Sequence, residues 1–69
     1  MDIVMLTKTF EEYKPDDIDE KVNKWISEMY AYQEITGFTI VSITPYATED
    51  YHSRCIIYTM NKEYTIKKE

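Results

Sequence analysis

A single stretch of the sequence, residues 16–36, has the apolar spacing of an amphipathic helix. Its apolar side chains recur every three or four residues and so fall on one stripe of a helix: Ile18, Val22, Trp25, Ile26, Met29 and Tyr32. We expect Asp16 to cap the N-terminus of this helix, and Gly37, the only glycine of the sequence, to end it in the left-handed conformation. A lone helix must bury its stripe against another element, and strand-like segments lie on both sides of it. The pattern therefore predicts an α+β fold.

The segment before the helix has the composition of a strand. Residues 2–10 are mostly good strand formers, and residues 11–15 then connect them to the helix. The apolar run at 3–6 predicts a strand covered on both faces, either central in the sheet or at an oligomer interface. We favour the central position.

The segments after the helix predict two further strands. In chain order we expect a second strand at 38–44 ended by Pro45, a polar loop at 45–50 and a third strand at 51–60. A tight turn at Asn61 and Lys62 would lead into a short fourth strand around 64–66. The predicted order is β-α-β-β, with or without the fourth strand. It forms one domain over residues 1–69, with the helix on a small sheet that is mainly antiparallel.

Size makes a lone core marginal for this chain. At 69 residues it buries only about 60% of the surface that the unfolded chain exposes. Cys55 is the only cysteine, so an internal disulfide is impossible, and with His52 it makes up the whole set of soft metal ligands. We expect no metal and no cofactor, and therefore predict a homo-oligomer.

The cysteine content and the charge indicate where such a chain works and what it binds. A lone cysteine is typical of a reducing, cytoplasmic setting, and no run approaches the roughly 20 apolar residues of a membrane span. The net charge is −5, with acidic residues concentrated in 11–34 and a mildly basic segment at 51–69. General nucleic-acid binding needs clustered cations, so we expect none, although a local anion site remains open.

Two groups of reactive side chains favour structural roles over catalysis. The acidic run from Asp16 to Glu20 lacks the spacing and the turn glycine of a calcium loop and suits a helix N-terminus instead. His52 and Cys55 lie three residues apart on a predicted strand and would therefore point to opposite faces. Without a nucleophile and base that can meet, we expect no enzymatic activity.

The third strand carries the best candidate for a ligand site. His52 and Arg54 share one face of it, beside a loop with Tyr46 and Tyr51. A guanidinium, an imidazole and aromatic planes suit a phosphate attached to a base, because arginine binds phosphate through two donors and tyrosine stacks. The alternative is an ordinary solvent-facing strand with polar side chains.

Tyrosine is unusually abundant for so small a core. Tyr58 completes the candidate ligand set, and the full series is Tyr13, Tyr30, Tyr32, Tyr46, Tyr51, Tyr58 and Tyr64. Tyrosine is enriched at interfaces because it buries area while keeping a polar tip. The surplus favours an exposed binding or oligomer surface.

Three segments of the chain form a further pattern: Lys8-Thr9-Phe10-Glu11-Glu12, Asp17-Ile18 with Lys21-Val22-Asn23-Lys24-Trp25-Ile26, and Ser53-Arg54-Cys55-Ile56-Ile57-Tyr58. With these segments the chain resembles a family of very small proteins from spore-forming bacteria and their phages, which is named after a small sporulation protein. The chain departs from the family in a longer loop at 30–37 and an extension past Tyr58. The resemblance implies a fold and a setting but no catalytic residue.

Three functions are compatible with these patterns. The first is a phage or mobile-element oligomer with an anti-defence role, which sequesters a nucleotide-type host immune signal at Arg54, His52 and the tyrosines. The second is an inhibitor of a host protein, acting through the acidic helix or a tyrosine-rich surface. The third is a structural oligomer associated with sporulation.

Overall fold

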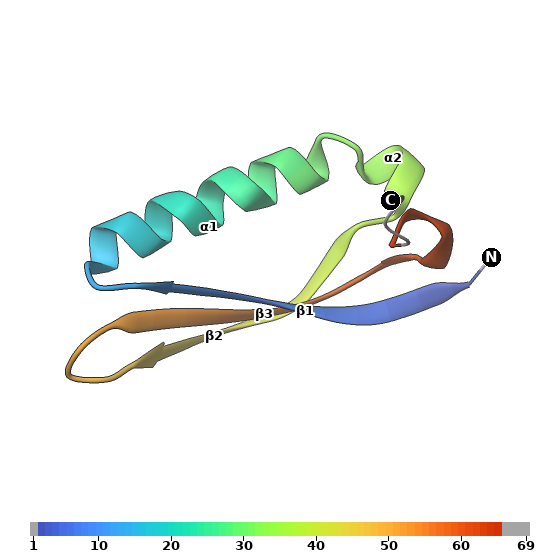
Figure 1. The fold of residues 1–69 in the computed structure, drawn as a ribbon. Helices are drawn as coiled ribbons and strands as arrows, with labels where there is room; N and C mark the ends of the chain where they lie inside the picture. The colour runs from blue at the N-terminus through green and yellow to red at the C-terminus, as the bar shows by residue number, and fades with distance from the viewer. Residues whose placement is uncertain (1, 66–69) are drawn as a thin grey trace, which may run out of the picture.

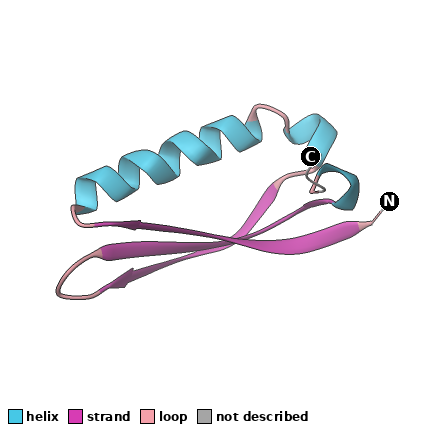
Figure 2. Cartoon of the chain, viewed as in Figure 1, coloured by secondary structure: helices cyan, strands magenta, loops and turns pink. Residues whose placement is uncertain are grey.

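A computed structural model describes residues 2–65 and confirms the α+β class (Figures 1 and 2). The elements in chain order are β1 (Ile3–Glu12), α1 (Pro15–Tyr30), α2 (Gln33–Thr36), β2 (Thr39–Ala47), β3 (His52–Asn61) and the 3-10 helix η1 (Lys62–Tyr64). The three strands form one antiparallel sheet, and α1 lies along one side of it. The order β-α-β-β is therefore the predicted one.

The central strand of the sheet is β3, so the prediction that the first strand is central was wrong. The strand order is β1-β3-β2, and β1 pairs with β3 from Ile3 opposite Asn61 to Glu12 opposite His52. The β2–β3 hairpin leaves one edge of β3 free, and β1 adds to that edge. The apolar run that suggested a central strand is divided between the two faces, because successive side chains of a strand alternate.

The second strand runs past the proline that we expected to end it. β2 continues to Ala47, with Pro45 opposite Arg54 in the ladder. Because β2 is an edge strand, the N–H that proline lacks can be the one facing away from β3. The register of β2 also shifts between Ile40 and Ser42, which places a bulge at Val41.

The helical segment begins and ends elsewhere than predicted. Lys14 occupies the N-cap position of α1, without a side-chain hydrogen bond to the helix, and Pro15 is the first residue of the helix, so the expected cap at Asp16 was wrong. Proline suits this position because its fixed φ is helical and its missing N–H would have no helical acceptor there. α1 ends at Tyr30, and the short helix α2 follows after Tyr32. Gly37, at φ 71°, then caps α2 in the predicted left-handed conformation.

The core lies between α1 and the helix side of β1 and β3. Ile18, Val22 and Ile56 form its buried centre. Trp25 lies among aromatic side chains. Its ring centroid is 5.8 Å from that of Phe10, 5.5 Å from that of Phe38 and 5.2 Å from that of Tyr58, and all three pairs are edge to face. Such pairs add about 0.5–1.5 kcal/mol each beyond the burial of area. The aromatic cluster thus compensates in part for a small aliphatic core.

The chain after β3 turns into η1 rather than into the fourth strand that we considered. Tyr64 belongs to η1 and Thr65 follows it, while Ile66 lies outside the described residues. No helix within residues 2–65 is long and apolar enough to cross a membrane.

Candidate functional site

The sheet has two chemically different faces. The face under α1 carries the even-numbered residues of β1 and β3, including Phe10, Ile56 and Tyr58. Directly opposed residues of an antiparallel pair share a face, so the register also defines the other face. We call it the open face and leave out Asn61, which opposes Ile3 but is buried and donates to the carbonyl of Ile35 in α2. The open face consists of these residues: Ile3, Met5, Thr7, Thr9 and Glu11 of β1, Thr39, Ser42, Thr44 and Tyr46 of β2, and Ser53, Cys55, Ile57 and Thr59 of β3.

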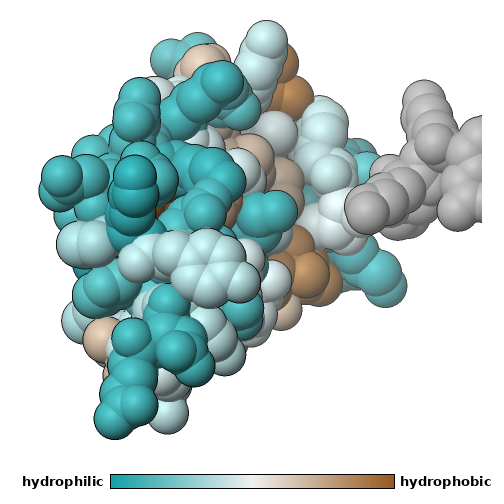
Figure 3. All heavy atoms as spheres, turned by 60° about the vertical axis from the view of Figure 1, so that its left-hand side comes forward, coloured by the Kyte–Doolittle hydropathy of each residue, from teal (hydrophilic) through white to brown (hydrophobic). Residues whose placement is uncertain are grey.

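Charge is almost absent from the open face. Of its thirteen residues only Glu11 is of a charged type (Asp, Glu, Lys or Arg), whereas such residues make up 30% of the whole chain. Hydrophilic side chains instead dominate the end of the molecule at which α1 begins (Figure 3). The antiparallel sheet of a monomer commonly turns a polar face to water. The open face is polar through its seven serine and threonine residues but almost without charge, and depletion of charge is a feature that it shares with the centre of protein–protein interfaces.

Large apolar side chains are nevertheless exposed on this face. The exposed fractions are 66% for Ile3, 65% for Met5 and 64% for Tyr46. Ile57 is half-buried at the middle of β3, between Thr7 and Ser42 on the neighbouring strands. The face therefore offers apolar area bordered by hydroxyl groups, which can be buried without removing charges from water.

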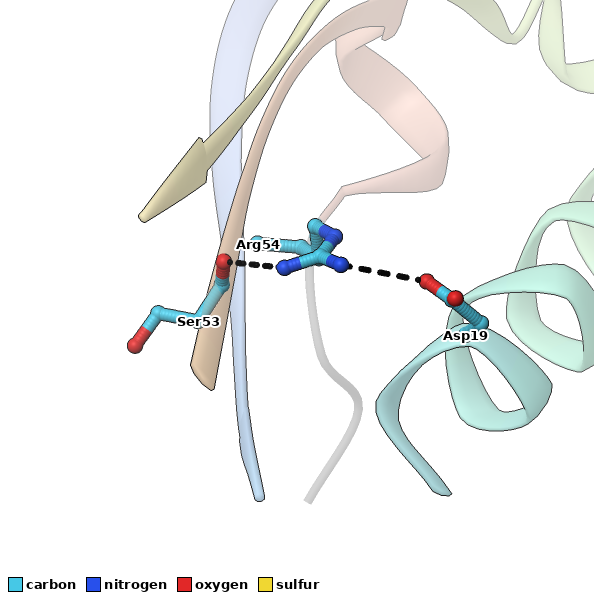
Figure 4. A network of polar contacts seen from close by, with 3 residues as sticks. All are labelled: Asp19, Ser53 and Arg54. Carbon is cyan, nitrogen blue, oxygen red and sulfur yellow. Dashed lines mark hydrogen bonds and ion pairs between the residues drawn. The ribbon is translucent and has the colours of Figure 1, made fainter. Parts of the chain in front are cut away.

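Arg54 is the centre of a polar contact between the sheet and the helix (Figure 4). Its guanidinium donates from Nη1 to the carbonyl of Ser53 at 3.0 Å and from Nη2 to Oδ1 of Asp19 at 3.3 Å. The side chain of Arg54 is 19% exposed and that of Asp19 is 62% exposed. One carboxylate of the acidic helix start thus ties α1 to β3.

The five residues of the predicted ligand site do not meet within the chain. His52 and Arg54 share the helix-side face, as expected from their spacing. Tyr58 is on the same face but packs in the core against Trp25. Tyr46 lies on the open face, because it opposes Ser53 in the ladder.

The fifth predicted residue, Tyr51, precedes β3 and lies beside acidic side chains. It lines a hollow together with Glu11, Glu12 and Tyr13. Carboxylates repel phosphate, so this hollow suits a cation better than a nucleotide.

Cys55 and His52 lie on opposite faces of β3, as their spacing predicts. Cys55 is half-buried on the open face between Thr9 and Thr44, while His52 opposes Glu12 on the helix side. The sheet therefore separates the thiol from the imidazole. Among residues 2–65, no three His, Cys, Asp or Glu side chains gather as a metal site.

Sequence reasoning missed the open face, although its signal is present in the printed sequence. Alternate positions 3, 5, 7 and 9 carry no charge, and neither do positions 53, 55, 57 and 59. That signal becomes meaningful only when the two strands are known to be neighbours. The tyrosine surplus did indicate an exposed contact surface, and Tyr46 belongs to the face found here.

Comparison with protein-family models, with curated proteins and with solved structures found no match to this chain. The resemblance to the small sporulation-protein family therefore stays a prediction.

Proposed function

We propose that this chain is a non-catalytic, homo-oligomeric protein-binding module whose contact surface is the open face. The observation that carries the proposal is the near absence of charge on a face that exposes Ile3, Met5 and Tyr46. Burying such a face costs little desolvation, whereas burying the charged outer side of α1 would cost much more. The function belongs to the class of protein inhibitors or adaptors rather than enzymes.

Charge at the rim of the open face specifies the chemistry of the partner. Glu11 lies at one end of the face, and Glu49 and Asp50 follow in the loop after β2. The whole chain carries a net charge of −5. Complementary potentials speed association and select among partners. The partner is therefore a protein with an uncharged contact patch and a basic surround, such as the host protein of the inhibitor hypothesis, and the phage and cytoplasmic setting remains predicted.

Charges introduced on the open face should weaken binding to that partner. We expect Thr44→Lys and Ile57→Lys each to lower the affinity at least tenfold, because each buries an ammonium group in an uncharged interface. The partner is captured from host lysate with the unmodified chain, purified, and titrated against each variant by calorimetry. Circular dichroism confirms that each variant is folded.

The matched control adds the same charge on the outer side of the helix. Asn23 is exposed on α1, so Asn23→Lys should change the affinity less than twofold. If Asn23→Lys abolishes binding while both open-face variants bind normally, the working surface is the helix and the proposal is wrong.

A second candidate function, sequestration of a nucleotide-type ligand, draws support from Arg54 and His52 sharing one face. Asp19 would compete with a phosphate for the guanidinium, but its side chain is 62% exposed, and ion pairs of solvent-exposed carboxylates contribute little in water. A phosphate could therefore displace the Asp19 carboxylate. Cyclic and ADP-ribose-derived nucleotides are the ligands to test.

Asp19→Asn should tighten nucleotide binding if this second function is correct, because it removes the competing carboxylate. We expect the affinity to rise about threefold to tenfold, whereas Arg54→Ala should abolish it. Isothermal calorimetry against the nucleotide panel measures both effects. No heat of binding up to millimolar ligand, for the unmodified chain and for Asp19→Asn, would exclude the function.

A further inference from the structure

The two edges of the sheet differ in their protection against pairing with another strand. The β2 edge has a proline at Pro45 and a bulge at Val41, two features that hinder the addition of a strand. β1 has neither: its ten residues pair with β3 in unbroken register. Within residues 2–65, no strand pairs with the outer edge of β1. A row of backbone donors and acceptors is therefore available along it.

We propose that β1 pairs antiparallel with β1 of a second copy, about a two-fold axis that passes beside Met5. The pairing joins two sheets into one continuous six-stranded sheet with both α1 helices on the same side. This inference rests on the proposed self-association and names the surface that performs it.

Symmetry limits the register of such a pair. The two-fold axis is perpendicular to the sheet, so each face of one copy continues as the same face of the other. Opposed residues must share a face, and this holds only if one residue of β1 opposes its own copy, with the axis between the two. With the axis at Met5, Asp2 opposes Lys8 of the second copy, and the reverse pair forms at the other end. Opposite charges across strands stabilise a pair, and like charges destabilise it.

The same register also matches the apolar side chains of β1. Val4 opposes Leu6 of the second copy on the helix side, and Met5 opposes Met5 on the open face. The apolar run at 3–6, which has the sequence of a central strand, then occupies the centre of the sheet. This pairing would explain why Val4 and Leu6, although apolar, are only half-buried on the edge strand of a single chain.

Other registers fit less well. An axis at Lys8 would oppose two ammonium groups, and an axis at Thr7 would oppose Asp2 to Glu12. An axis at Phe10 would oppose Lys8 to Glu12, but Glu12 already pairs with Lys21 and the apolar run would stay unpaired. The register at Met5 alone among these combines opposite charges with a paired apolar run.

The charged helix flank beside β1 does not obstruct this register. The hollow near Glu12 is lined by side chains of both signs: Asp17, Glu20, Lys21 and Lys24. Glu12 lies seven residues from Met5, so the two flanks would be about 46 Å apart along the strands and would not meet.

The dimer also gives the open face the size that binding a protein requires. Two strands of ten residues and one of nine, about 4.8 Å apart and with about 3.3 Å per residue, give a footprint of about 460 Å². A standard protein interface buries about 800 Å² on each partner. Two open faces joined edge to edge reach that area, and one alone does not.

A reciprocal charge exchange tests the register. Asp2→Lys and Lys8→Asp should each weaken the dimer about tenfold, because each opposes like charges at two symmetric positions, and the double variant should recover to within about threefold. Sedimentation equilibrium measures the dissociation constants, with circular dichroism as the check on folding. If the unmodified chain has the mass of a monomer at about 200 micromolar, its dimer is too weak to matter, and the proposal is overturned.

Disulfide trapping tests the axis independently of charge. In a Cys55→Ser background, Met5→Cys should form a covalent dimer under mild oxidation, because directly opposed Cα atoms lie about 4.5–5.5 Å apart. Thr9→Cys is the control, since its two copies would lie about 26 Å apart in this register. Trapping at Thr9 and not at Met5 would overturn the register. An unmodified chain that stays monomeric and yet binds a partner through the open face would refute the self-association, and a dimer that binds no partner would refute the protein-binding function alone.

Discussion

Phe38→Ala is expected to remove most of the stability of this protein. Phe38 is fully buried, and its ring lies 5.5 Å from Trp25, 4.9 Å from Tyr30 and 5.4 Å from Tyr58. Truncation of a buried phenylalanine costs about 3–5 kcal/mol. A domain of this length has a free energy of unfolding of about 3–10 kcal/mol in total. Urea denaturation followed by Trp25 fluorescence measures the loss.

Tyr32→Ala is the matched control for this prediction. Tyr32 is 65% exposed in the connection between α1 and α2, so its truncation should change the free energy of unfolding by less than about 0.5 kcal/mol. Equal urea midpoints for Phe38→Ala and the unmodified chain would show that the aromatic cluster does not form the core.

Gly37→Val is expected to cost about 2–3 kcal/mol of stability. Gly37 has φ 71°, a conformation that β-branched residues rarely adopt. A Cβ at this position would also lie 3.1 Å from Oδ1 of Asn61. Asn61 cannot easily yield, because it is buried and its Nδ2 donates to the carbonyl of Ile35 at 3.2 Å. Thermal and urea denaturation both report the change.

A double-mutant cycle separates backbone strain from the steric contact. In an Asn61→Ala background the contact disappears, so Gly37→Val should cost less there than in the unmodified chain. Gly37→Asn should be the mildest change, because asparagine tolerates the left-handed conformation. Equal costs for valine in both backgrounds would assign the whole effect to the backbone.

The sequence predicted those parts of the fold that depend on local periodicity. The helical stripe gives Ile18 and Val22 as buried residues, and the structure buries both. The end of that helix was misplaced, because Tyr32 continues the stripe in sequence although α1 has already ended at Tyr30. Periodicity identifies a face but not the residue at which a turn interrupts it.

The order of strands in the sheet could not be predicted, because it depends on pairing between distant residues. The run at 3–6 is compatible with a central strand and with an edge that another chain covers. The residues of the candidate ligand site lie apart within the chain for a related reason. Whether Tyr46 shares a face with Arg54 is decided by the register of β2 on β3, and the structure opposes Tyr46 to Ser53 instead.

Pro45 and the bulge at Val41 have a consequence for how far assembly can proceed. A sheet with two open edges can add chains without limit and grow into a filament. In the proposed dimer, the two-fold pair would cover the β1 edge from Asp2 to Lys8 in both copies. The protected β2 edges would then end growth, so that assembly would close at two molecules and give a discrete particle.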